Sequence, residues 1–162
     1  MQMHLMQVRL PSPLVTPLEP EQLDLWRAFL NAHAHVTRAI GRDLAAAGLP
    51  DLGWYDLLWT LYRAPERRLR VNELAREVVL SPTAMSRFVD RAEAAGVVRR
   101  EPDPADRRAL QVAITDEGVA LLRRMWPVYE QGIERHFAAQ VDRSPQRLRA
   151  MLERMAASAR PG

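Results

Sequence analysis

The sequence contains no cysteine among its 162 residues. Disulfide bonds, thiolate metal sites and thiol-based redox switches are therefore excluded, and the chain is compatible with a reducing cytoplasm. Lysine is also absent, so all 23 basic residues are arginine, and the formal net charge is only +3. Residues 63–108 hold 11 arginines against 8 acidic residues, whereas the rest of the chain holds 12 of each. The positive excess lies in one segment, as expected of a surface that binds phosphates.

Long apolar runs are missing as well. No segment approaches the ~20 apolar residues that a membrane span needs. Residues Met1–Arg9 lack the cationic start and apolar core of a signal peptide. We therefore expect a soluble protein of the cytoplasm, with the size of one domain and enough length to bury a good core.

Signatures of catalysis are also absent. The histidines are scattered along the chain at His4, His33, His35 and His136, and no HExxH motif, phosphate-binding loop or nucleophile elbow occurs. A metal site at His33 and His35 is disfavoured, because residues two apart on a helix point away from each other. We expect neither an enzyme nor a cofactor.

The stretch after Leu80 predicts a helix with a polar outer face. Ser81 can cap its start, and Pro82 can occupy the first turn, where its missing N–H costs nothing. One face is apolar and should pack on a core: Met85, Phe88, Val89 and Ala92. The other face carries hydroxyls beside charged groups: Thr83, Ser86, Arg87, Asp90 and Arg91. Such side chains can read base edges and hold phosphates, although an ordinary solvated helix face would show the same pattern.

Two short strands follow this helix. Gly96 can end the helix, and Val97–Glu101 has the composition of a strand. Apolar residues then alternate with others, the period of a strand with one buried face: Leu110, Val112 and Ile114 against Gln111, Ala113 and Thr115. We predict a β-hairpin whose tip is Pro102–Arg108. There Asp106 can hold Arg108 extended for a minor groove, and the alternative is a solvated turn with a surface ion pair.

The residues before Ser81 complete a helix-turn-helix. Val71–Val79 fits a short helix with these residues facing inward: Leu74, Ala75, Val78 and Val79. A tight connection through Leu80 leads to the second helix, which in this motif enters the major groove. With the hairpin attached, the unit is a winged helix. The predicted fold class is mainly α with a small β-hairpin wing (α+β).

The segment from Asn72 to Gly118 resembles the DNA-binding core of the MarR (multiple antibiotic resistance regulator) family of bacterial transcription factors. Its motifs occur in order: ELA in the first helix, the serine that opens the recognition helix, RxxDR in its body, GVVRR before the wing, DxR at the wing tip and TxxG at the next helix. The flanking helices also fit the family, so the resemblance covers roughly residues 20–158.

The resemblance implies a homodimer on double-stranded DNA. Each subunit would place its recognition helix in a major groove and its wing tip in the adjacent minor groove, with Asp106 orienting Arg108 for insertion. The implied DNA-binding residues are Ser81, Pro82, Thr83, Ser86, Arg87, Arg91, Asp106, Arg107 and Arg108.

The remaining helices carry more apolar surface than a small winged helix needs. A long amphipathic helix should run from Pro20 to near Gly48, and later helices should begin at Thr115 and Ser144. Their surplus apolar faces indicate a dimer interface, although the two ends of the chain could instead pack within one subunit. We expect a flexible arm at 1–18 and one domain at 19–162. Within that domain the winged helix covers about 52–114, and the dimerisation helices cover about 20–47 and 115–158.

By the same resemblance, a small aromatic or phenolic effector would bind in a crevice beside the first two helices. The candidate pocket residues are His33, Trp54, Asp56, Trp59 and Arg63, each of which could instead belong to the core or to a helix surface. Two functions stay open. The favoured one is a sequence-specific regulator, most often a repressor that leaves a pseudo-palindromic operator on binding its effector. The other is a winged-helix module for protein interaction or DNA architecture without sequence preference.

Overall fold

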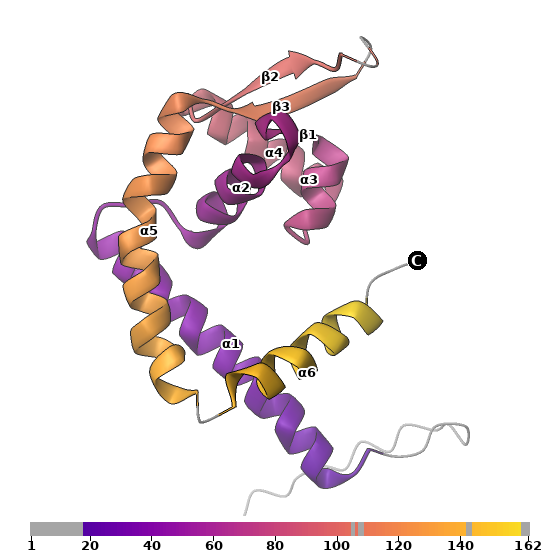
Figure 1. The fold of residues 1–162 in the computed structure, drawn as a ribbon, viewed down its shortest axis with the longest axis vertical. Coiled ribbons are helices and arrows are strands. Elements are labelled where there is room, and N and C mark those ends of the chain that lie inside the picture. The colour runs from indigo at the N-terminus through magenta and orange to yellow at the C-terminus, as the bar shows by residue number, and fades with distance from the viewer. Residues whose placement is uncertain (1–17, 105, 107–108, 142–143, 160–162) are drawn as a thin grey trace, which may run out of the picture. The chain divides into compact units, whose positions relative to one another are not determined.

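The computed structural model describes residues 18–104, 106, 109–141 and 144–159. The chain divides into two units between Ala34 and His35, and we describe each by itself. Figure 1 shows the elements in their order along the chain. The helices are α1 (Pro20–Ala46), α2 (Leu52–Arg63), α3 (Val71–Glu77), α4 (Pro82–Ala94), α5 (Asp116–His136) and α6 (Pro145–Ser158). The strands are β1 (Arg68–Arg70), β2 (Val98–Pro102) and β3 (Leu110–Ile114), and short 3₁₀ turns cover Pro65–Arg67 and Ala138–Gln140.

Helix α4 forms as its sequence predicts. The Ser81 hydroxyl accepts a hydrogen bond from the backbone N–H of Ala84 at 3.2 Å, and Pro82 opens the first turn. All four residues of the predicted inner face are buried: Met85, Phe88, Val89 and Ala92. Gly96 follows the helix with a φ of +75°, a conformation that favours glycine.

The turn before α4 differs from the prediction. Leu74 and Ala75 of α3 are buried as expected, and Val78 is partly buried. Val79, which we predicted to face inward, is 87% exposed. The reason is that α3 already ends at Glu77 and Val79 takes a left-handed φ of +58°, which turns its side chain away from the inner face of the helix.

A third strand joins the predicted hairpin. Strand β1 pairs antiparallel with β3, so the sheet order is β1-β3-β2, and helices α2, α3 and α4 pack against this sheet (Figure 1). The strict alternation predicted for β3 is wrong at two positions. Leu110 is 51% exposed because it pairs with Pro102 at the end of the hairpin nearest the tip. Ala113 is buried because the long side chains of its cross-strand neighbours, Arg68 and Arg99, cover the small methyl group.

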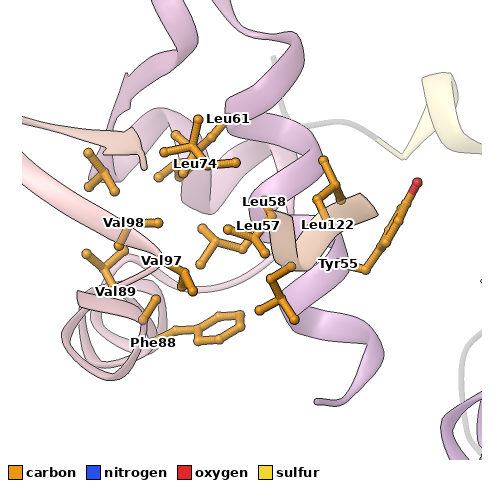
Figure 2. Close-up of a cluster of buried hydrophobic side chains, with 14 of the residues drawn as sticks. Tyr55, Leu57, Leu58, Leu61, Leu74, Phe88, Val89, Val97, Val98 and Leu122 are labelled. Carbon is orange, nitrogen blue, oxygen red and sulfur yellow. The ribbon is translucent and has the colours of Figure 1, made fainter. Parts of the chain in front are cut away.

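The core joins the sheet, the helix-turn-helix and α5. Figure 2 shows Leu57, Leu58 and Leu61 of α2 beside side chains of α3, α4 and β2. The start of α5 is held closely against this unit. The Thr115 hydroxyl caps the helix by accepting from the N–H of Gly118 at 3.1 Å and donates to the carbonyl of Gly96 at 2.7 Å. These bonds fix the direction in which α5 leaves the winged helix.

Helix α6 begins where Ser144 and Pro145 predict it, but without a side-chain cap. Ser144 has φ −141° and ψ 62°, unlike the extended backbone of Ser81 and Thr115, and its hydroxyl makes no capping hydrogen bond. None of the described helices is long and apolar enough to cross a membrane.

Candidate nucleic-acid interface and effector cavity

The outer face of α4 presents the side chains that the sequence placed there. Pro82, Thr83, Arg87 and Arg91 are exposed, and Ser86 is half-buried. The hydroxyl oxygen of Ser81 is occupied by the capping bond, so this residue has its hydroxyl proton left to donate. The helix therefore offers short polar groups and two guanidinium groups on one accessible surface.

Asp90 does not pair with its helical neighbours Arg87 or Arg91. Instead its carboxylate binds the guanidinium of Arg100 on β2 at 2.6 Å. Arg100 also pairs with Glu93, whose carboxylate accepts from the Arg100 backbone N–H at 2.8 Å. These hydrogen bonds hold the pKa of Glu93 below its ordinary value. Because Asp90 and Glu93 are both bound to Arg100, Arg87 and Arg91 have no acidic partner among the described residues.

The arginines of the winged helix divide into two groups by their partners. On the sheet and around it, most arginines are paired with carboxylates: Arg63 with Glu77, Arg68 with Glu66 and Glu101, Arg70 with Asp103, Arg99 with Glu101, and Arg100 with Asp90 and Glu93. Arg67 before β1, Arg76 on α3, and Arg87 and Arg91 on α4 have no such partner in the described part of the chain, and Arg67 lies over the ring of Tyr62. Three of these four arginines are exposed on the helix-turn-helix, where a polyanion could neutralise their charge.

The wing tip is described only in part. Asp106 is among the described residues, whereas Arg107 and Arg108 lie outside them. Backbone hydrogen bonds close the loop, from the Asp103 N–H to the Ala109 carbonyl at 3.0 Å and from the Ala109 N–H to the Asp106 carbonyl at 2.8 Å. The orienting role predicted for Asp106 toward Arg108 stays a prediction.

A cavity of about 680 Å³ lies between α2 and α5. Of the five predicted pocket residues, Asp56 and Trp59 line it. Trp54 is not on the face of α2 that lines this cavity. Its ring packs edge-on against Phe88 of α4, with ring centroids 5.7 Å apart. Arg63 pairs with Glu77 of α3 at 3.1 Å and lines a different hollow. His33 belongs to the N-terminal unit and is not among the lining residues.

Aromatic side chains that the sequence analysis missed dominate the cavity: Tyr55, Tyr62, Trp126 and Tyr129, beside Trp59. Tyr55 points away from the core centre (Figure 2) and meets Tyr129 with ring centroids 4.6 Å apart. The signal was available in the helical spacing, because Tyr55, Trp59 and Tyr62 share one face of α2.

Two charged groups lie among these rings, Asp56 of α2 and Arg123 of α5. Although Asp56 is an exposed residue, partial desolvation of its carboxyl, followed by the nearby charge of Asp51, raises the pKa of that group. Burial and the charge of Asp56 raise the pKa of Tyr129. Neither Asp56 nor Arg123 forms an ion pair or side-chain hydrogen bond with another described residue. The cavity thus combines flat apolar walls with one acid and one base whose partners are not supplied by the described chain.

Comparisons with known proteins agree with this architecture. The sequence profile of the MarR family matches residues 47–109. The transcriptional repressor IacR of Pseudomonas putida is 29% identical over 121 residues, which cover 75% of this chain and 71% of the relative. AbsC, a MarR family regulator from Streptomyces coelicolor, superposes with a TM-score of 0.77 at 27% identity, over 90% of this chain and 96% of that one.

A second structure from Streptomyces coelicolor supports assignment of the chain to a family. Sco3205, a MarR family transcriptional regulator solved in complex with DNA, superposes with a TM-score of 0.82. It is 30% identical, and the match covers 93% of this chain and 95% of that chain. Together with the helix-turn-helix, the wing and the flanking helices described above, this likeness establishes that the chain belongs to the MarR family of transcriptional regulators.

Proposed function

We propose that this protein is a sequence-specific regulator of transcription that binds double-stranded DNA through α4 and the wing. The observation that carries the proposal is the pair of guanidinium groups, Arg87 and Arg91, on the exposed face of α4 without an acidic partner among the described residues. Arginine can bind guanine with two hydrogen bonds, and Thr83 and Ser86 beside it can bind most base edges. Catalysis has no part in this function, and the protein would act on the nucleoid in the cytoplasm.

The proposed contacts divide between two grooves. Ser81, Pro82, Thr83, Ser86, Arg87 and Arg91 would face the major groove and its phosphates. The wing-tip residues Asp106, Arg107 and Arg108 would serve the minor groove, an assignment that rests on the family resemblance. Two copies related by a two-fold axis would then meet successive major grooves on a pseudo-palindromic operator of roughly 16 to 20 base pairs.

A homodimer accounts for the apolar surface of the N-terminal unit. Several large apolar side chains of this unit are exposed in the single chain: Leu18, Leu23, Leu25, Trp26, Phe29 and Leu30. All of these residues except Leu18 lie on α1, and large exposed apolar residues gathered on one helix mark an interaction surface. A second copy of α1 offers the same residues, so a two-fold interface can bury both sets.

The DNA-binding proposal is tested by selection and by one arginine substitution. Duplexes selected by the protein from a random library should bind it more tightly than scrambled duplexes at physiological salt in gel-shift titrations. Arg87→Ala should cost about 1 to 3 kcal/mol on the selected duplex if Arg87 reads a base. The control Arg124→Ala, which removes one exposed guanidinium from α5, should leave affinity within about twofold. Equal affinity for selected and scrambled duplexes would favour the architectural module instead.

We further propose that the cavity between α2 and α5 binds a small aromatic effector that lowers the affinity for DNA. Its five aromatic rings suit a planar ligand, and Asp56 and Arg123 would bind polar substituents. The probes are 2-naphthol, 2-naphthoate and 2-naphthylmethylamine, each measured by calorimetry and by release of the selected duplex. At least one probe should bind the protein and cause it to release the duplex. Trp126→Ala should weaken the binding of that probe to the protein by about tenfold. If a probe released DNA from Trp126→Ala as readily as from wild type, the effector would bind outside this cavity.

A further inference from the structure

Asp103 is a buried carboxylate at the base of the wing tip. It follows β2 directly and is 3% exposed, and no other charged residue in the described ranges is buried to this degree. Moving a carboxylate out of water is costly unless a cation and hydrogen bonds compensate for it. We therefore looked for groups outside the β2–β3 hairpin that stabilise this carboxylate.

One compensating cation is Arg70, the last residue of β1. Its Nε donates to Asp103 Oδ2 at 2.6 Å, and a terminal guanidinium nitrogen lies 2.5 Å from the same oxygen. This contact follows from the sheet register. Arg70 pairs with Gln111, which pairs with Glu101 on the other side, and Asp103 is two residues beyond Glu101 on the same face. Arg70 thus reaches diagonally across the end of the sheet to the wing.

The backbone of Asp103 organises the loop that carries the tip. Its N–H donates to the Ala109 carbonyl at 3.0 Å, and its carbonyl accepts from the Asp106 N–H at 3.2 Å. The side chain and the backbone of one residue therefore hold two different parts of the molecule. A displacement of the Asp103 side chain would be transmitted to the loop containing Asp106.

Arg70 makes an equally direct link to the helix-turn-helix. It immediately precedes α3, and its backbone N–H donates to the Glu73 carboxylate in the first turn of α3 at 2.8 Å. Helix α3 in turn packs against α4. A continuous chain of contacts thus runs from the wing loop through Asp103 and Arg70 to the helix that supports the recognition helix.

We propose that Arg70 and Asp103 are positioning residues for DNA binding, which fix the wing tip relative to α4 so that both can engage the duplex together. This inference rests on the proposed DNA-binding function. An ion pair with one buried partner, such as Asp103, contributes little net stability, because desolvation of the carboxylate offsets most of the attraction, but its geometry is specific. Orientation of the wing is therefore the property that this pair supplies.

The test separates the two grooves chemically on a duplex selected by the wild-type protein. Dimethyl sulfate reports guanine N7 in the major groove, and hydroxyl radicals report the sugars that line the minor groove. At saturating protein, Asp103→Asn should keep the guanine protection and lose the protection at the wing. Its affinity should fall about tenfold, the size expected when one contact element must be ordered during binding.

Two further variants keep the result interpretable. Arg70→Gln/Asp103→Asn removes both charges of the pair, so no unpaired arginine is left beside the wing, and it should show the same footprint and the same loss as Asp103→Asn. Arg63→Gln removes an ion pair between α2 and α3 that does not touch the wing, and should bind as wild type. Wild-type hydroxyl-radical protection in Asp103→Asn or in the double variant would overturn the inference. Failure of the wild-type protein to select any duplex would instead overturn the proposed function.

Discussion

At the scale of single residues, Gly118 lets the start of α5 lie close to the backbone of Val97, because glycine has no side chain. A Cβ at this position would lie 2.1 Å from the carbonyl oxygen of Val97 and 2.7 Å from Cγ1 of Ile114. Gly118→Ala should therefore lower the free energy of unfolding by about 3 kcal/mol or more, because backbone must move to admit the methyl group. Urea denaturation followed by circular dichroism measures this change.

Gly41→Ala is the matched control for this substitution. Gly41 lies inside α1 with no atom within 4 Å of the added Cβ, so alanine should raise the free energy of unfolding by about 0.5 to 1 kcal/mol. A Gly118→Ala protein within about 1 kcal/mol of wild type would contradict the proposed contact with Val97.

Local chemistry made some residues predictable from the sequence and left others out of reach. The caps at Ser81 and Thr115 depend on hydrogen bonds to residues three positions away, so the sequence contains all that they need. Val79 has a backbone conformation that β-branched residues rarely adopt. The spacing of apolar residues therefore led us to extend the predicted helix through Val79, although α3 ends at Glu77. The partner of Asp90 was also out of reach, because Arg100 comes from a different element and competes with the arginines at helical spacing.

At the scale of elements, Arg100 ties β2 to the recognition helix through Asp90 and Glu93. The hydrogen bonds from Arg100 hold the pKa of Glu93 below its ordinary value of 4.5, so ionised Glu93 favours the folded state. This contribution is complete above about pH 5 and disappears as the pH falls through the lowered pKa. Glu93→Gln should therefore lose less stability than wild type on acidification from about pH 5 to pH 3.

Denaturation midpoints measured across this pH range provide the comparison. Glu130→Gln removes an exposed carboxylate of α5 that pairs with no described arginine, and it serves as the control for the loss of one carboxylate. If the curve for Glu93→Gln ran parallel to that of wild type, the link between β2 and α4 would not be electrostatic.

Elements with a long periodic pattern of apolar residues could be predicted from the sequence. A very short strand, and a cavity formed by two separate helices, could not. The four apolar positions of α4 fixed its inner face, and the hairpin followed from two segments around a polar tip. Strand β1 is only Arg68–Arg70, too short for alternation to distinguish it from a loop. The cavity was missed in part because its walls come from α2 and α5, which are far apart in the sequence and meet only in the fold.

At the scale of the whole molecule, the proposed dimer makes a prediction about α1. Phe29→Glu places a carboxylate within the exposed apolar group that includes Trp26 and Leu30, and should raise the dimer dissociation constant by about 100-fold. Sedimentation velocity across a concentration series measures this constant. Arg27→Glu, on the same stretch of α1, changes a side chain that is 71% exposed and should leave the dimer intact. Equal association of Phe29→Glu and wild type would exclude this face from the interface.

The cavity walls also give the protein an optical property of its own. Trp59 and Trp126, two of its four tryptophans, are 44% and 43% exposed and line the cavity, whereas Trp26 should be shielded in the dimer. Acrylamide added to the dimer would therefore quench mainly the emission of these two indoles. A molecule seated between α2 and α5 should reduce the Stern–Volmer slope, and DNA alone should not. Occupancy of the cavity could then be followed without any attached dye, independently of whether the protein is on DNA.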